Sequence, residues 1–309
     1  MIKRPISDNE LKEHIASLAE DGREIFLLEG GKVRLTAVAA TGMCNEMRTN
    51  HNLGPLETYI LGQGYVAGAL LASTVKGNDR IRLEIECGGP VKGMSIESWA
   101  SGAVRGYLLA NPIKLEKPLE SLNTSLLYGP GFLTITKILE GAKTPFSGQI
   151  MLEHGDLAND LALYFQQSEQ TPTLFYLSLH FDEKASLYGA GGLFIQALPG
   201  AEDDTLERIQ EKAKGLDNLS KCLSAGMSIR EYVEKEFKDF STEHLERRMI
   251  GFSCPCSKNS FIHYLAGLPE KEKDAIKEGE FPLEVECFNC GTVYSFEKEE
   301  VEKAFGGAL

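Results

Sequence analysis

The sequence predicts an α+β fold in three parts. A layered, mainly antiparallel N-terminal domain is expected over residues 1–200, a charged helical linker over 201–250 and a small C-terminal domain over 251–309. Segments that alternate apolar and polar residues dominate the first part, with few helical segments between them. Composition changes after Pro199-Gly200, and two close pairs of cysteines mark the last part.

The strands of the N-terminal domain are predicted to be half-buried. Segment Arg80–Glu86 alternates charged and aliphatic residues, as does an antiparallel strand with one face on a core. Helices rarely alternate with single strands along the chain, so a layered α+β domain is favoured over a doubly wound sheet. The predicted strands lie at 25–28, 33–39, 80–87, 104–109, 132–139, 175–181 and 193–198.

Helices are predicted between these strands at 8–20, at about 56–74 and at 156–168. Ser7 and Glu10 have the spacing of a capping box at the start of the first helix. Asp156 precedes the third helix and is expected to cap it rather than to act in catalysis. The second helix is rich in Leu, Ala and Gly, which suits close packing against a neighbour.

The linker at 201–250 combines a high charge density with apolar residues at helical spacing. Asp, Glu, Lys and Arg make up 21 of its 50 residues, against 25% of the whole chain. Two interpretations stay open: solvated amphipathic helices that rest on the main domain, or a marginal segment that needs a neighbour to stay folded. Its apolar residues, called the linker stripe below, are Leu206, Ile209, Ala213, Leu216, Leu219, Leu223, Ile229, Tyr232, Val233 and Phe237.

The C-terminal domain is predicted to contain three helices and one hairpin. A domain of this size is near the limit of what a hydrophobic core alone can stabilise. Metal binding is therefore expected to supply much of its folding free energy. The helices are placed at 257–268, 270–277 and 297–305, and the strands of the hairpin at 283–286 and 293–296.

Four of the seven cysteines form two close pairs in this domain. Cys254 and Cys256 enclose one residue, whereas Cys287 and Cys290 enclose two and are followed by Gly291. Two such pairs can close a tetrahedral shell of thiolates, which predicts one Zn²⁺ per chain on these four residues. The first pair is narrower than is usual for structural zinc. Its thiols could oxidise to each other once the metal leaves, which suggests a redox switch.

The remaining candidate ligands are weaker. His263 lies in the same domain and could replace one sulfur, although four cysteines already complete the shell. Cys44, Cys87 and Cys222 are separate in sequence and lie in apolar or helical contexts. We interpret these three as buried or incidental thiols, because a free cysteine usually behaves as a small hydrophobic residue.

The chain contains no convincing catalytic motif. Segment Gly62–Ala67 matches G-x-G-x-x-A, with Glu84 and Glu86 about twenty residues further on, which imitates a dinucleotide-binding fingerprint. No buried strand precedes it, however, and its small residues are explained by a tightly packed helix. No nucleophile elbow, phosphate-binding P-loop or His-Glu-x-x-His pattern occurs. We therefore expect that the protein is not an enzyme.

Composition and charge limit the partners and the compartment. A formal net charge of −13 over 309 residues disfavours a nucleic-acid partner, since phosphates would be repelled overall. No apolar run is long enough to span a membrane. The N-terminal segment is polar and acidic rather than a signal peptide, and an odd number of cysteines is typical of reduced thiols, so a cytoplasmic location is expected.

The cysteine pairs and their flanking residues resemble the redox-regulated 33-kDa heat-shock chaperone family of bacteria. Phe252–Ser257 and Glu284–Cys290, with Tyr294 and Phe296, look like the zinc domain of that family. The resemblance covers about 65–305, with the motifs in the same order. The other similar segments are Lys76–Arg80, Gly88–Pro90, Val104–Tyr107, Phe146–Gln149, Tyr164–Phe165, Ser168–Pro172, Gly191–Gln196 and Pro199–Ala201.

This resemblance implies an ATP-independent holdase that is inactive while reduced and zinc-bound. In the family, oxidation releases zinc, joins neighbouring cysteines into disulfides and unfolds the zinc domain and the linker. The pairs here would be Cys254 with Cys256 and Cys287 with Cys290. The activated chaperone then binds unfolded or partly unfolded client proteins and associates as a homodimer. Zinc keeps thiolates deprotonated, which suits attack on an oxidant.

Two functions from other classes stay open at this point. A zinc-ribbon interaction protein would hold a purely structural metal that mild oxidant does not remove. A thiol-disulfide oxidoreductase would use Cys287 and Cys290 and would turn over a disulfide substrate in the presence of a reductant.

Overall fold

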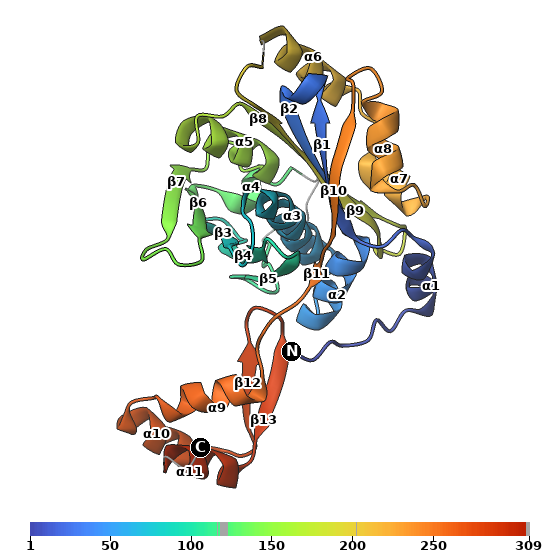
Figure 1. The fold of residues 1–309 in the computed structure, drawn as a ribbon. Helices are drawn as coiled ribbons and strands as arrows, with labels where there is room; N and C mark the ends of the chain where they lie inside the picture. The colour runs from blue at the N-terminus through green and yellow to red at the C-terminus, as the bar shows by residue number, and fades with distance from the viewer. Residues whose placement is uncertain (116, 118–122, 202, 307–309) are drawn as a thin grey trace.

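The computed structural model describes residues 1–115, 117, 123–201 and 203–306, without the side chains of 203–206. The fold is α+β, as predicted. A five-stranded sheet, a six-stranded sheet and the helices around them form the body of the protein. A smaller C-terminal unit extends from this body (Figure 1). The linker helices lie against the body on the side of the first sheet (Figure 1).

The first sheet has five antiparallel strands in the order β10-β1-β2-β9-β8. Its strands include the predicted segments at 25–28, 33–39, 175–181 and 193–198. Alternation sends Phe26 and Leu35 toward the linker helices and Val38 and Phe194 toward the centre of the body. The strands are β1 (Gly22–Leu28), β2 (Val33–Ala39), β8 (Thr173–Phe181), β9 (Leu187–Ala197) and β10 (Glu243–Met249).

The second sheet has six strands in the order β11-β5-β4-β3-β6-β7. All of its pairs are antiparallel except that β11 runs parallel to β5. Strands β4, β7 and β11 were not predicted from the sequence. The strands are β3 (Arg80–Cys87), β4 (Gly93–Trp99), β5 (Ala103–Leu108), β6 (Gly131–Ile138), β7 (Phe146–Met151) and β11 (Gly251–Phe252).

Helix α3 (Pro55–Leu71) lies at the centre of the body and is buried almost all round. It packs on β4 and β5 of one sheet and on β9 and β8 of the other. A Cβ atom at Gly62, Gly64 or Gly68 would come within 2.5–2.7 Å of side chains on these strands. The G-x-G-x-x-A match therefore lies inside a helix that needs small residues for packing, as the sequence analysis proposed.

The remaining helices of the body are short. Helix α5 begins after Asp156, whose carboxylate accepts a hydrogen bond from the Asn159 amide, so the predicted cap is confirmed. The predicted capping box at Ser7 and Glu10 is wrong: Asp8 is the cap, and Glu10 then occupies the second helical position, where it cannot complete the box. The elements are α1 (Asn9–Ser17), η1 (Glu29–Gly31), α2 (Thr41–His51), η2 (Ala72–Thr74), α4 (Ser125–Tyr128) and α5 (Leu157–Ser168).

The linker forms helices α6 (Asp203–Lys214), α7 (Leu219–Ser224) and α8 (Ile229–Glu236). They rest on the outer face of the first sheet, which agrees with the first of the two interpretations. The last part of the linker was predicted to be helical, and this prediction is wrong, because residues Glu243–Met249 form strand β10. The buried members of the linker stripe are Ile209, Leu219, Leu223, Ile229, Tyr232, Val233 and Phe237, whereas the side chain of Leu206 lies outside what the structure describes.

The C-terminal unit has the predicted helices and hairpin. They are α9 (Lys258–Ala266), α10 (Glu270–Lys277), β12 (Leu283–Cys287), β13 (Thr292–Phe296) and α11 (Lys298–Phe305). Its own core has only four buried residues among those described, Leu265, Tyr294, Phe296 and Val301. Strands β10 and β11 pair with strands of the body, although the predicted boundaries assign them to the linker and to the C-terminal domain. The division into domains at residues 200 and 250 therefore stays a proposal. No helix in the described part of the chain is long and apolar enough to cross a membrane.

Candidate metal centre

The four paired cysteines converge at the junction between the C-terminal unit and the body. Their sulfur atoms all lie within 4.8 Å of one another. Cys254 and Cys256 follow β11, whereas Cys287 ends β12 and Cys290 precedes β13. The end of β11 and the β12–β13 hairpin thus bring together cysteines that are about thirty positions apart in the sequence.

The turn between Cys287 and Cys290 holds the second pair. The Cys290 and Gly291 amides both donate to the Cys287 carbonyl, at 3.1 and 2.8 Å. Gly291 has φ +63°, and a Cβ atom there would lie 2.4 Å from the Asn50 carbonyl oxygen. Glycine is therefore required at this position both for backbone conformation and for the close approach of α2.

The separations between sulfurs fit a tetrahedral metal. Zn–S bonds of about 2.3 Å place the corners of a tetrahedron about 3.8 Å apart. The Sγ atoms of Cys254 and Cys287 are 3.9 Å apart, and those of Cys256 and Cys290 are 3.4 Å apart. Four sulfur donors favour a thiophilic ion such as Zn²⁺ over a hard cation such as Mg²⁺ or Ca²⁺.

Positive charge from the body reaches the first pair. Arg105 on β5 places Nη1 3.3 Å from the Cys254 Sγ, and its other nitrogens bind the carboxylate of Glu97. Glu97 is itself buried and also pairs with Arg80 at 2.8 Å. A divalent ion with four thiolates carries a net charge of −2, so the Arg105 guanidinium offsets part of a charge that is largely buried.

The protonation of the thiols is strongly coupled. Hydrogen bonds from the Cys287 and Cys290 thiols, and then from Arg105, lower the pKa of Cys254. The same hydrogen bond with Cys254 raises the pKa of Cys287. Four thiolates cannot share so small a volume without a cation, because their charges repel one another. A bound divalent ion would allow all four to lose their protons.

The body and the N-terminal segment hold the cysteine loops from outside. The Asn50 amide donates to the carbonyl oxygens of Cys290 and Ile2, at 2.9 and 3.0 Å. The Thr292 hydroxyl donates to the same Ile2 carbonyl at 3.1 Å, and the Met1 sulfur lies 3.1 Å from the Cys254 amide. These residues carried no signal in the sequence analysis, since nothing local links them to a cysteine pair.

The other sequence candidates lie outside this cluster. His263 sits on α9, where its ring Nδ1 contacts the Asn259 carbonyl at 2.7 Å. Cys44 is fully buried on α2, and burial raises the pKa of its thiol. Cys87 and Cys222 are half-buried on β3 and α7. Cys287 and Cys290 are 6% and 0% exposed, which leaves a protein disulfide no access to them in this conformation.

Comparisons with known proteins agree on one family. A family profile described as Hsp33 protein matches residues 21–297. The chain is 32% identical over 274 residues to a 33 kDa chaperonin of Desulforamulus reducens, covering 88% of this chain and 93% of that protein. It is 32% identical to a 33 kDa chaperonin of Geobacter sp., with 90% and 94% covered.

A solved structure is also similar. The crystal structure of the 33 kDa chaperonin from Thermotoga maritima, a heat shock protein 33 homologue, superposes with a TM-score of 0.82 at 30% identity. The match covers 92% of this chain and 98% of that one, so body, linker and C-terminal unit are all included.

Proposed function

The chain belongs to the Hsp33 protein family, and from this premise we propose that it is a redox-regulated, ATP-independent holdase. As a member of this family it is a chaperone-type protein. The finer proposal is that the reduced, zinc-bound form is inactive. Oxidation then releases the metal and exposes a surface for unfolded or partly unfolded client proteins. No catalytic step on a substrate is part of this function.

One observation supports the proposal above the others: the sulfur cluster joins the C-terminal unit to the body. Asn50 binds the Cys290 carbonyl, and Arg105 contacts the Cys254 sulfur. Loss of the metal would therefore loosen both the fold of the small unit and its attachment to the body. Strand β10 and the linker helices lie immediately upstream of this attachment, so their packing would lose its anchor.

The chemistry of activation balances within the four thiols and the oxidant. Each disulfide forms when two thiolates give two electrons to hydrogen peroxide, which takes up two protons from solvent and is reduced to two molecules of water. Oxidised sulfurs are poor ligands for a divalent ion, so the metal is released as the pairs form. We propose that the activated protein associates as a homodimer. We further propose that it acts in the cytoplasm and binds neither nucleic acid nor membranes.

Zinc release and chaperone activity are expected to appear together when the reduced protein is treated with hydrogen peroxide. Zinc would be followed with a chromogenic chelator, and activity by suppression of the aggregation of a denatured client. A Cys222→Ser variant is the control, because it removes a thiol outside the cluster. Zinc that stays bound under oxidant would favour the structural zinc-ribbon alternative. Catalytic turnover of a disulfide substrate would favour the oxidoreductase.

Disulfide connectivity tests whether unfolding accompanies oxidation. We expect adjacent pairs, Cys254–Cys256 and Cys287–Cys290, because short loops close at lower entropic cost once the metal no longer holds the pairs together. In the folded protein, however, the short sulfur contacts join one member of each pair, Cys254 with Cys287 and Cys256 with Cys290. Peptide mapping that found mainly these crossed pairs would show that both bonds form within the folded state.

A further inference from the structure

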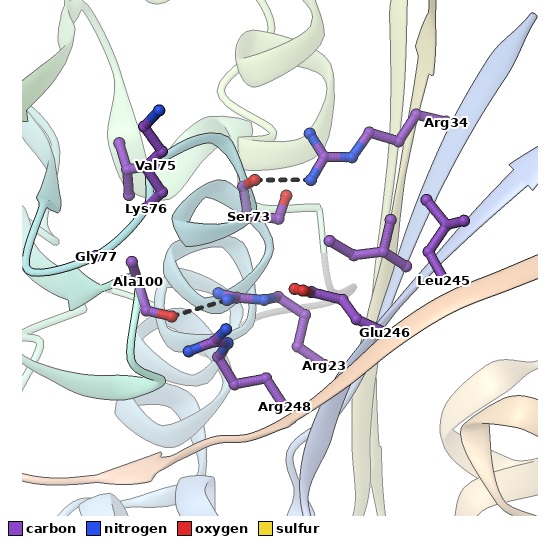
Figure 2. Close-up of a pocket in the computed structure, with 11 residues that line it drawn as sticks. Arg23, Arg34, Ser73, Val75, Lys76, Gly77, Ala100, Leu245, Glu246 and Arg248 are labelled. Atoms are coloured by element: carbon purple, nitrogen blue, oxygen red, sulfur yellow. Dashed lines mark hydrogen bonds between the residues drawn. The ribbon is translucent and has the colours of Figure 1, made fainter. Parts of the chain in front are cut away.

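A second site lies where β10 meets β1. A cavity of about 380 Å³ opens there between the first sheet and the end of α3 (Figure 2). Four cationic side chains line it: Arg23 on β1, Arg34 on β2, Arg248 on β10, and Lys76 after η2. Among the described residues that line it, Glu246 is the single carboxylate.

The arrangement is unusual for a protein with a net charge of −13. Arg23 and Arg248 are direct partners across the β1–β10 ladder, and like charges in such a position destabilise a strand pair. The other face of the same two strands is complementary. There Glu24 pairs with His244 at 2.9 Å and with Arg247 at 3.7 Å.

Hydrogen bonds within the protein satisfy some, but not all, of the donors on the cationic side chains that line the cavity. Arg23 donates to the Ala69 carbonyl at 3.2 Å and to the Ala100 carbonyl at 3.0 Å, and Arg34 donates to the Ser73 carbonyl at 2.7 Å. Figure 2 shows the bonds to Ala100 and Ser73. These contacts stabilise the carbonyl end of α3 and the segments that follow it. Arg23 is only 2% exposed, yet its Nε has no acceptor among the described residues.

The charges of the site also act on one another. Burial, and after it the neighbouring charge of Arg248, lower the pKa of Arg23 to about 10. Glu246 opposes this shift for both Arg23 and Arg34. One carboxylate against four cations leaves a formal excess of positive charge in a partly enclosed space. An anion placed there would relieve the repulsion between β1 and β10.

We propose that this cavity binds a small inorganic phosphate anion, such as pyrophosphate, that bridges Arg23 on β1 and Arg248 on β10. The exposed guanidinium of Arg248 can bind phosphate oxygens through two parallel hydrogen bonds, and the exposed Lys76 can add a third contact. Arg23 has its Nε left to donate, because its two Nη atoms already bind carbonyl oxygens. No aromatic residue lines the cavity among those described, so it offers no platform for a nucleotide base. The negative charge of the whole protein disfavours a long polyanion.

The bound anion would fasten β10, which is otherwise an exposed edge strand. Ligands that bind only the docked strand stabilise that docking by mass action. Because β10 connects α8 with β11 and the cysteine loops, the site lies on the path between the linker stripe and the metal centre. Under the proposed function, a phosphate anion would therefore hold the linker in its closed arrangement and oppose activation.

Isothermal titration of the full-length, reduced, zinc-loaded protein with pyrophosphate tests the site directly, with ionic strength held constant by NaCl. We expect one saturable site, with affinity at least about tenfold lower in Arg248→Gln and lowered to a smaller degree in Lys76→Gln. Arg247→Gln is the matched control. It removes the same charge from the adjacent residue on the opposite face and should leave affinity within about twofold.

Hydrogen exchange gives a second readout that does not depend on folding differences between variants. Pyrophosphate should slow exchange over 243–249 in the unmodified protein and have little effect there in Arg248→Gln. The proposal would be overturned if pyrophosphate showed no saturable binding, or if its affinity fell equally in Arg247→Gln and Arg248→Gln. ATP binding more than tenfold more tightly than pyrophosphate would also overturn it, because that would indicate a nucleotide site. None of these readouts requires chaperone activity, so this site and the proposed function can fail separately.

Discussion

Replacing Cys287 with serine is expected to remove most of the bound zinc and to unfold the C-terminal unit while the body stays folded. Serine keeps nearly the same volume but does not supply a thiolate, so one corner of the tetrahedral shell is lost. Substitutions outside the ligand shell already lower metal affinity about 10–100-fold, and loss of a ligand should weaken it by at least about 100-fold. The expected result is a zinc content well below one per chain after dialysis.

The structural consequence follows from the size of the small core. Only Leu265, Tyr294, Phe296 and Val301 are buried in it among the described residues, whereas the body has two large clusters of its own. Without the metal, these few contacts are not expected to offset the entropy of ordering residues 250–305. Hydrogen exchange should therefore rise throughout α9–α11 and the β12–β13 hairpin but not in α3 or β9.

Cys222→Ser provides the matched control, since this thiol lies half-buried on α7, outside the cluster. It should keep a full complement of zinc. If the metal holds the chaperone inactive, Cys287→Ser should also suppress client aggregation without oxidant. Undiminished zinc in Cys287→Ser would refute the assignment of four sulfurs.

The metal-binding cysteines could be predicted from the sequence because each pair is closely spaced along the chain. A spacing of two or three residues within each pair limits where the sulfurs can point, and Gly291 marks the turn that holds the second pair. The helix at 55–71 was also readable, because its glycines and alanines have a packing reason. Both features depend on neighbours in sequence and need no knowledge of distant contacts.

Features that depend on long-range pairing could not be read in this way. Strand β10 has no alternation of apolar residues, because most of it is exposed to solvent and its positions that face the cavity carry Glu246 and Arg248. It is a strand because β1 supplies the hydrogen bonds. Helix α2 was missed for a similar reason, since its sequence is largely polar and only the fold brings Asn50 to the cysteine turn.

Leu219→Glu is expected to raise holdase activity in the reduced, zinc-loaded protein toward the level that oxidation produces. Leu219 is the first residue of α7 and is 0% exposed. Together with Leu223 it packs on Gly191 of β9. An uncompensated charge in such a place destabilises by about 3–5 kcal/mol. That is enough to detach a helix of only six residues, whereas the central cluster around α3 lies on the far face of the sheet.

Detachment would uncover two apolar surfaces at once. One is the linker stripe itself, including Leu223 and Phe237, and the other is the sheet face beneath it, including Phe26 and Leu35. An unfolding client could bind either surface, while the charged residues of the linker keep the complex soluble. This is why exposure of the linker, rather than disulfide formation as such, is expected to limit activity.

The control is Lys221→Glu, which adds a carboxylate to the exposed side of the same helix and should leave activity at the reduced baseline. Zinc content and the cooperative thermal transition of the body should be retained in Leu219→Glu, which separates local opening from global unfolding. Hydrogen exchange should rise across 203–249 in this variant and in the oxidised wild-type protein alike. If the linker is equally protected in reduced and oxidised protein, the client surface lies elsewhere in the N-terminal body and the stripe serves only to pack the fold.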